Sequence, residues 1–227
     1  VKNNIFATEN ICNLSSKYSC ELIFVSTDKA ADPESILGYT KKVAEKICES
    51  FNSKNINKKK MKIVRFGNVF GSSGSAINNF MDKINDEEIV QITNKKASRY
   101  FMTITEACHL VLQTTSINLK KNIFILNMGK PINIFSLAKN LAKIKVNLNP
   151  NYKFKYAFTG LQPGEKLKET LKGKGEVLKM LNNEIFEVSQ NYQTKESFNL
   201  YYKNLVTKYN EFNKKKLINH LKKISKY

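Results

Sequence analysis

Apolar and polar residues follow two periodicities along this chain, one typical of buried strands and one typical of helices. Runs of β-branched and aromatic residues at positions 22–25, 61–66 and 123–126 predict buried strands. Between the first two runs, apolar residues at helical spacing predict a helix: Ile36, Val43, Ile47 and Phe51. Strand, helix and strand in this order are typical of a parallel α/β sheet.

Further elements are predicted on both sides of this unit. An amphipathic helix is expected over residues 3–18, and other helices are expected after Ser75, Thr103 and Pro131. Thr103 and Glu106 have the spacing of a capping box, which would begin the helix there. Short strands are expected at 89–93 and 153–158, and one or two basic amphipathic helices over 198–224. We expect this last segment to pack on the domain rather than to lie on a membrane.

The length allows one sizeable core, or one sheet with a small appended lobe, because the chain has 227 residues. It begins with Val rather than Met. It contains no apolar run of membrane-spanning length and no signal-peptide pattern. We therefore expect a cytoplasmic protein, of which this chain is a piece.

Composition argues against several kinds of site. The cysteines show no C-x-x-C spacing: Cys12, Cys20, Cys48 and Cys108. With only two histidines as well, no metal site and no Ser-His-Asp triad is expected. The formal net charge of +19 favours ligands that carry phosphate. The lysines are nevertheless spread along the whole chain without interleaved arginine and aromatic residues, so dedicated nucleic-acid binding is not expected.

The first predicted strand carries a group of chemically active side chains at its carboxyl end. Ser26, Thr27, Asp28 and Lys29 follow the apolar run, at the edge where open α/β sheets hold ligands. The next helix would bring Lys41 back beside them. Hydroxyls, a carboxylate and two amines so placed are suited to moving protons. The alternative is a strand end at which Asp28 caps the next turn and the lysines are simply solvated.

A series of motifs extends this stretch along the chain. They are Ser26-Thr27-Asp28-Lys29-Ala30, Gly38-x-Thr40-Lys41, Arg65-Phe66-Gly67-Asn68-Val69-x-Gly71-Ser72-x-Gly74-Ser75, Arg99-Tyr100-Phe101-Met102-Thr103-Ile104 and Gly160-Leu161-x-Pro163-Gly164-Glu165-Lys166-Leu167. In this order they resemble the motifs of the nucleoside-diphosphate-sugar 4,6-dehydratases of the CapD-like polysaccharide-biosynthesis group, within the extended short-chain dehydrogenase/reductases. The resemblance runs from Val1 to about Leu171.

The resemblance implies a fold and a division of the chain. The expected fold is α/β, the C-terminal part of a Rossmann-like doubly wound parallel sheet with a small C-terminal substrate-binding lobe. Residues 1–135 would form the Rossmann-like half, residues 136–190 the substrate-binding lobe and residues 191–227 a basic helical tail. The glycine-rich turn G-x-G-x-x-G that binds a dinucleotide in such folds is absent from the sequence. We therefore expect the cofactor-binding half to lie upstream of Val1.

The resemblance also implies a reaction, in which a tightly held NAD or NADP takes hydride from C4 of a UDP-N-acetylhexosamine. Water then leaves across C5 and C6, and the hydride returns at C6, which gives a 4-keto-6-deoxy sugar for polysaccharide or glycan biosynthesis. In this scheme Asp28 protonates the departing hydroxyl and Lys29 is the base at C5, while Thr27 and Lys41 assist at C4. Ser26 and Lys41 would contact the cofactor. The substrate would be bound by Asn68, Ser75, Arg99, Gln162 and Glu165. The expected partners are a UDP-sugar and either a second copy of the chain or an upstream half of the same protein, with any membrane contact confined to that upstream region.

Two departures from the family pattern keep alternatives open. Leu37 stands four residues before Lys41, where many short-chain dehydrogenases have Tyr and the longer CapD-like dehydratases often have Met. Gln162 stands where the family has Arg, and a Gln side chain cannot neutralise a diphosphate. Asn78 and the sequence Asp86-Glu87-Glu88 also differ from the usual residues. A related nucleotide-sugar epimerase and a catalytically incomplete fragment or pseudoenzyme are therefore the alternative functions.

Overall fold

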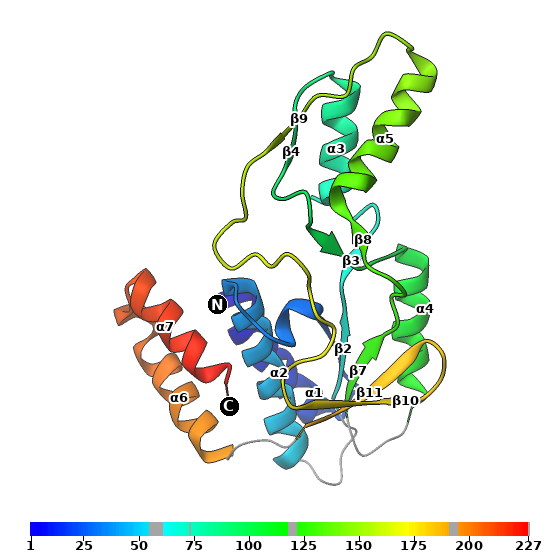
Figure 1. Cartoon of the computed structure of the whole chain (residues 1–227). Coiled ribbons are helices and arrows are strands. Elements are labelled where there is room, and N and C mark those ends of the chain that lie inside the picture. Colours follow the sequence, from blue (N-terminus) through cyan, green and yellow to red (C-terminus); the bar gives the residue numbers. More distant parts are fainter. Residues whose placement is uncertain (55–60, 73, 118–121, 191–194, 227) are drawn as a thin grey trace. The chain divides into compact units, whose positions relative to one another are not determined.

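The computed structural model describes residues 1–54, 61–72, 74–117, 122–190 and 195–226 (Figure 1). Two compact units make up the chain. Unit 1 contains Val1–Phe66, Val111–Asn127 and Thr170–Tyr227, and unit 2 contains Gly67–Leu110 and Met128–Glu169. Each unit is thus built from segments that lie far apart in the sequence. The domains predicted at 1–135, 136–190 and 191–227 are continuous segments and stay a prediction.

Unit 1 is built around a five-stranded sheet in the order β1-β2-β7-β11-β10 (Figure 1). Its strands are β1 (Ile23–Thr27), β2 (Lys62–Phe66), β7 (Ile123–Leu126), β11 (Ile185–Gln190) and β10 (Glu176–Met180). The first three strands are parallel, and β11 and β10 add an antiparallel hairpin. The predicted α/β fold with a parallel sheet is confirmed.

The hairpin of β10 and β11 was not predicted, although the sequence carries a signal for it. Two runs with β-branched and aromatic residues flank Asn182 and Asn183, and Asn favours tight turns. The side-chain oxygen of Asn182 accepts hydrogen bonds from the backbone N–H groups of Glu184, at 2.9 Å, and Ile185, at 2.7 Å. This side chain therefore closes the turn.

Strand β1 is the outermost strand of this sheet in the part of the chain that the structure describes. The backbone N–H of Lys62 donates to the carbonyl of Leu22 at 2.8 Å. This register directs the backbone of Phe24 and Ser26 toward β2 and that of Val25 toward the outer edge. Val25 is also 45% exposed, so both its backbone and its side chain lie at the edge.

Helices of unit 1 bury the apolar core of this sheet. A π-helical turn (Lys2–Phe6) leads into α1 (Ala7–Tyr18), and α2 (Ile36–Lys54) packs against α1, β1 and α7 (Lys214–Ile224). The side chain of Ser35 caps α2, since its oxygen accepts from the N–H of Gly38 at 3.1 Å.

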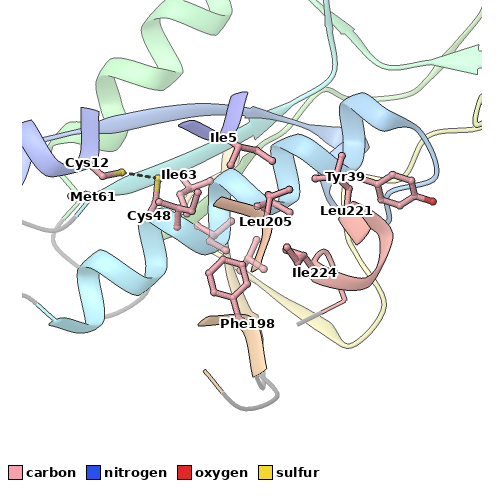
Figure 2. Close-up of a cluster of buried hydrophobic side chains, with 14 of the residues drawn as sticks. Ile5, Cys12, Tyr39, Cys48, Met61, Ile63, Phe198, Leu205, Leu221 and Ile224 are labelled. Carbon is pink, nitrogen blue, oxygen red and sulfur yellow. Dashed lines mark hydrogen bonds between the residues drawn. The ribbon is translucent and has the colours of Figure 1, made fainter. Parts of the chain in front are cut away.

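The C-terminal helices α6 (Lys195–Lys208) and α7 contribute to the same core, which confirms that the segment 198–224 packs on the domain. The cluster joins residues from both ends of the chain (Figure 2): Ile5, Cys12, Tyr39, Cys48, Met61, Ile63, Phe198, Leu205, Leu221 and Ile224. Within it, the sulfur atoms of Cys12 and Cys48 lie 3.7 Å apart as free thiols.

Unit 2 has a smaller core between two helices and a pair of short strands. Helices α3 (Ala76–Asn85) and α5 (Ile134–Leu148) pack together, and β4 (Val90–Ile92) pairs in parallel with β9 (Tyr156–Phe158). Two further strand pairs are short: β3 (Asn68–Val69) with β6 (Phe101–Met102), and β5 (Ser98–Arg99) with β8 (Ile132–Asn133). The core residues of this unit include Phe80, Ile84, Val90, Ile92 and Phe135.

Helix α4 (Ile104–Thr115) begins at the capping box predicted from the sequence. The hydroxyl of Thr103 accepts from the N–H of Glu106 at 3.1 Å, and the carboxylate of Glu106 accepts from the N–H of Thr103 at 2.7 Å. This reciprocal pair confirms the capping box. Of the helices in the described ranges, none is long and apolar enough to cross a membrane.

Candidate active site

The carboxyl end of β1 turns directly into a short 3-10 helix that carries Asp28 and Lys29 (Asp28–Ala30). Thr27 caps this turn, because its hydroxyl oxygen accepts from the N–H of Lys29 at 3.4 Å. The Thr27 hydroxyl donates to Oδ1 of Asp28 at 2.9 Å, and the ammonium of Lys29 donates to the same oxygen at 3.0 Å. The sequence-predicted triplet therefore forms one hydrogen-bonded group, capped by Thr27 rather than by Asp28.

The carboxylate of Asp28 is buried, with only 1% of the side chain exposed, whereas 26% of the Lys29 side chain is exposed. Its second oxygen, Oδ2, is buried and has no hydrogen-bond partner among the described residues. Buried polar atoms nearly always have partners in folded proteins, so an exception calls for a functional explanation. Oδ2 is thus the atom of this group whose hydrogen-bonding capacity no described residue uses.

Lys41 reaches β1 from one turn inside α2. Its ammonium donates to the backbone carbonyl of Val25 at 3.0 Å and lies 4.8 Å from the centre of the Phe24 ring. Burial lowers the pKa of Lys41, and the charge of Glu45 opposes this shift. The helix therefore brings Lys41 to the strand that leads into the Asp28 turn, where it contacts Val25 and Phe24.

The positions near Lys41 on α2 also behave as expected. Leu37, four residues before Lys41, is 48% exposed. Tyr39 is buried in the apolar core, so its phenol belongs to the core of unit 1. Tyr39 is therefore a core residue, and Leu37 is the residue that stands one turn before Lys41.

A buried group of charges lies next to this triplet, and we call it the Arg65 network: Ser26, Lys42, Glu45, Arg65 and Glu176. Arg65 is fully buried, and its Nε and Nη2 donate to the two oxygens of Glu45, each at 2.7 Å. Its Nη1 donates to both oxygens of Glu176, each at 2.8 Å. Two carboxylates thus share one guanidinium, a bidentate arrangement that Lys could not make.

The remaining members tie the Arg65 network to the triplet and to α2. The hydroxyl of Ser26, one residue before Thr27, donates to Oε1 of Glu45 at 2.6 Å. The ammonium of Lys42 lies 3.3 Å from Glu176 and 3.8 Å from Glu45. Burial, the largest single influence, raises the pKa of Glu45, but the Arg65 guanidinium, the Lys42 ammonium and the Ser26 hydroxyl together outweigh burial and hold that pKa below its usual value. The Arg65 guanidinium and the Glu45 carboxylate thus each favour the charged form of the other.

Sequence analysis named Arg65 and Ser26 but not the network that joins them. Glu45 and Glu176 lie far apart in the sequence, and neither belongs to one of the motifs described above. The available signal was the position of Arg65 inside an apolar strand, because a charge at such a position needs buried partners.

The predicted substrate-binding residues belong to unit 2, whereas Ser26, Thr27, Asp28, Lys29 and Lys41 belong to unit 1. Arg99 and Glu165 form an ion pair of 2.7 Å, and the backbone N–H of Gln162 donates to Glu165 at 3.1 Å. Unit 2 therefore brings Arg99, Gln162 and Glu165 together. Arg99 also donates to the carbonyls of Ser98, at 2.9 Å, and Leu167, at 3.2 Å.

Ser75 and Asn68 occupy the two ends of the glycine-containing loop before α3. The side chain of Ser75 caps α3 by accepting from the N–H of Asn78 at 3.3 Å. The backbone N–H of Asn68, in β3, donates to the carbonyl of Tyr100 at 2.9 Å. Gly71 and Gly74 between them both have φ of 73°, a conformation that favours glycine. In the described ranges, no three His, Cys, Asp or Glu side chains lie close enough to hold a metal ion.

Comparison with known proteins places the chain among polysaccharide-biosynthesis proteins. The capsular polysaccharide biosynthesis protein CapD of Staphylococcus aureus is 36% identical over 220 residues, which cover 96% of this chain and 36% of CapD. The probable polysaccharide biosynthesis protein EpsC of Bacillus subtilis is 40% identical over 178 residues, 78% of this chain and 29% of EpsC. A UDP-glucose 4-epimerase of Rickettsia bellii is 30% identical and covers 79% of this chain and 51% of its own length. The chain thus spans about a third of the length of CapD and EpsC.

Solved structures confirm the Rossmann-like fold. Pen from Bacillus thuringiensis matches with a TM-score of 0.76 at 28% identity, covering 85% of this chain and 59% of Pen. The UDP-glucuronic acid 4-epimerase of Bacillus cereus, solved with UDP-glucuronic acid and NAD, matches with a TM-score of 0.63 at 18% identity, covering 74% of this chain and 57% of the epimerase. At this low identity the second likeness shows the fold alone.

The sequence of residues 1–190 matches a family model described as "Polysaccharide biosynthesis protein". This match extends beyond Leu171, to which the resemblance was predicted to run, and includes the β10–β11 hairpin that holds Glu176. The chain belongs to this family of polysaccharide biosynthesis proteins.

Proposed function

We propose that this chain supplies the proton-transfer residues and the sugar-binding unit of a nucleotide-sugar 4,6-dehydratase that acts on a UDP-N-acetylhexosamine. The observation that carries the proposal is the environment of Asp28. One oxygen of this buried carboxylate is held by Thr27 and Lys29, and the other has no partner among the described residues. A general acid contacts the group that it protonates through a hydrogen bond, and this second oxygen has hydrogen-bonding capacity that no described residue uses.

The contact between Lys29 and Asp28 supplies both the base and the acid. The 3.0 Å hydrogen bond lets one proton pass from the Lys29 ammonium to the Asp28 carboxylate. The product is a neutral amine, which can take the C5 proton, and a carboxylic acid, which can protonate the C6 hydroxyl as the C6–O bond breaks. Water leaves, and the pair returns to its charged form with the total number of protons unchanged.

A nicotinamide cofactor would supply the hydride chemistry at C4 and C6 when bound. Lys41 and Ser26, near the carboxyl end of β1, are the candidates for contacting it, with Thr27 and Lys41 assisting at C4. The lowered pKa of Lys41 brings its amine closer to exchanging a proton near neutral pH. This sequence has no glycine-rich turn that could bind the pyrophosphate of the cofactor. We therefore infer that a further half of the enzyme binds the pyrophosphate of NAD or NADP.

Arg99, Gln162 and Glu165 are proposed to hold the UDP-sugar together with Asn68 and Ser75. Glu165 orients the Arg99 guanidinium through the 2.7 Å ion pair. Thr93 donates to the same carboxylate oxygen at 3.0 Å, which fixes Glu165 in turn. An arginine held in this way is suited to contacting phosphate.

A 4-epimerase is the second candidate, favoured by the match to the Rickettsia enzymes. Leu37 argues against it, because an epimerase of this superfamily is expected to have Tyr there. The exposed position of Leu37 on α2 leaves no phenol one turn before Lys41. A catalytically incomplete fragment remains the third reading, for residues 1–227 by themselves.

Mass spectrometry of the product distinguishes these functions. The chain, joined to its dinucleotide-binding half, is incubated with UDP-N-acetylglucosamine and NAD. A dehydratase gives a product that has lost one water, and an epimerase gives a product of unchanged mass with altered chromatographic mobility. The Lys29→Ala variant, which lacks the proposed base, is the control. An unchanged-mass product from the wild-type enzyme would overturn the dehydratase assignment, and no product at all would favour the incomplete fragment.

A further inference from the structure

The turn that carries Asp28 and Lys29 lies between two glycines from other parts of unit 1. At Gly38, in α2, an added Cβ would lie 2.5 Å from the carbonyl oxygen of Lys29. At Gly173, between the family motifs and β10, an added Cβ would come inside contact distance of the carbonyl oxygen of Ala31. Both backbones therefore approach the turn more closely than any residue with a side chain allows.

Glu176 fixes the position of Gly173. The carboxylate of Glu176 accepts from the N–H of Gly173 at 2.7 Å, and the N–H of Glu176 donates to the carbonyl of Gly173 at 3.2 Å. Glu176 is itself buried and held by Arg65 through two hydrogen bonds of 2.8 Å. Gly173 is thus attached to a rigid point in the sheet rather than to a freely moving loop.

The same Arg65 network also holds the strand that leads into the turn. Ser26 and Arg65 are direct neighbours in the register of β1 and β2, and both bind the carboxylate of Glu45. Glu45 lies one turn beyond Lys41 on α2. One set of buried charges therefore fixes the start of the turn through Ser26 and its far side through Gly173.

A need for fixed geometry explains the Arg65 network better than a gain in folding stability does. Replacing a buried ion network by apolar residues of similar size is often neutral or stabilising, so burying four charges here needs another reason. Proton transfer depends on the placement of the acid and base, and a small displacement lowers the rate strongly. A rigid support behind Asp28 and Lys29 meets that need.

We propose that Gly173 and Glu176 are positioning residues, which hold the Asp28–Lys29 turn through the Ala31 carbonyl in the geometry that the elimination step requires. The inference rests on the proposed function, because it gives the turn a catalytic task. Neither residue is assigned any contact with the substrate or the cofactor.

The test compares two glycines of the same loop. Gly173 is not among the glycines with positive φ, so Gly173→Ala adds a methyl group against Ala31 without straining its own backbone. Gly175 has φ of 76° and open space around it, so Gly175→Ala strains the loop without touching Ala31. The second variant is therefore a matched control for lost stability.

We expect Gly173→Ala to lower kcat by about tenfold or more while KM for the UDP-sugar stays within about twofold. Gly175→Ala should keep kcat within about twofold of the wild type even where its Tm is lower. Equal kcat losses in both variants, or an unchanged kcat in Gly173→Ala, would overturn the inference. No turnover by the wild-type enzyme would instead refute the proposed function.

Amide hydrogen exchange on residues 1–227 tests the positioning without any activity. The N–H of Ala31 donates to the carbonyl of Asp28 at 3.1 Å, so its exchange rate reports on the turn. Gly173→Ala and Glu176→Gln should both speed this exchange by about tenfold, and Gly175→Ala should not. The inference assigns the effect of Gly173→Ala and Glu176→Gln to the turn alone. Unchanged exchange at Ala31 in both variants, or failure of both variants to fold, would therefore contradict it.

Discussion

Replacing Arg65 by Met tests how strongly the Arg65 network couples the sheet, α2 and β10. The substitution leaves a shorter, unbranched apolar side chain and removes the guanidinium that binds both Glu45 and Glu176. The two carboxylates stay buried, and the ammonium of Lys42 lies 3.8 Å from Glu45 and 3.3 Å from Glu176. Removing one partner of a buried ion pair costs about 3–5 kcal/mol, and two stranded carboxylates place this case near 5 kcal/mol.

This loss is large compared with the stability of a folded domain, which is about 5–15 kcal/mol. For a chain of this size, about 5 kcal/mol corresponds to a Tm lowered by roughly 10–20 °C. Urea unfolding followed by circular dichroism measures the free energy directly, and an unchanged m-value would show that the folded state is the same. The quadruple variant Lys42→Met, Glu45→Leu, Arg65→Met and Glu176→Leu is the control, and it should recover most of the loss because it removes all four charges and strands none of them.

The pH dependence of the same variant gives a second measurement. In the wild type the pKa of Glu45 is lowered, so its contribution is present above the pKa of the unfolded chain and is lost as the pH falls through the folded value. Without Arg65, burial would raise this pKa, so the deficit of Arg65→Met should shrink as the pH falls from about 7 to about 5. A deficit below about 1 kcal/mol at neutral pH, or one that grows in acid, would refute the reasoning.

Three further predictions follow from the site and its surroundings. Lys29→Ala should abolish dehydration while UDP-sugar affinity stays within a few fold, since the base acts at C5 and not on the nucleotide; product formation near the wild-type rate would contradict its role. Residues 1–227 by themselves should show no NAD binding in calorimetric titration, because the sequence has no glycine-rich turn for the pyrophosphate; micromolar binding would show that the cofactor site lies within this chain. Burial lowers the pKa of Lys46 to about 8. Between about pH 8 and 10 the unfolded chain therefore binds more protons than the folded chain, so the free energy of unfolding rises with pH over this range. Lys46→Met should raise the Tm at pH about 7 and remove that rise, while the exposed Lys222→Met should not, as calorimetry across this range would show.

Local patterns predicted those parts of the structure that depend on local chemistry. The apolar runs gave β1, β2 and β7, and the spacing of Thr103 and Glu106 gave the start of α4. The triplet after β1 was predicted as one site because strand direction alone sets which residues follow a carboxyl end. The structure adds the detail that Thr27 both caps the turn and binds Asp28.

Long-range pairing accounts for what could not be predicted. No residue near Arg65 in the sequence indicates that Glu176, which lies 111 residues later, is its partner. Gly173 has no turn conformation that would mark it, and its need for glycine arises from the close approach of the Ala31 carbonyl and the Glu176 carboxyl group. The grouping of Arg99 with Glu165 across 66 residues depends in the same way on the fold. The motifs include Arg65, Arg99 and Glu165, but they do not predict which residues these side chains contact.

The chain order of unit 1 has a consequence for synthesis. Arg65 leaves the ribosome 111 residues before Glu176, which at about 5–20 residues per second is a delay on the order of 10 s. Residues of unit 2 make up much of the intervening chain. During that interval Glu45 alone must compensate the guanidinium, and β7 has no β11 beside it. The nascent chain therefore exposes an incomplete sheet edge until the β10–β11 hairpin has emerged. We expect chaperone binding to matter most during this stage of synthesis.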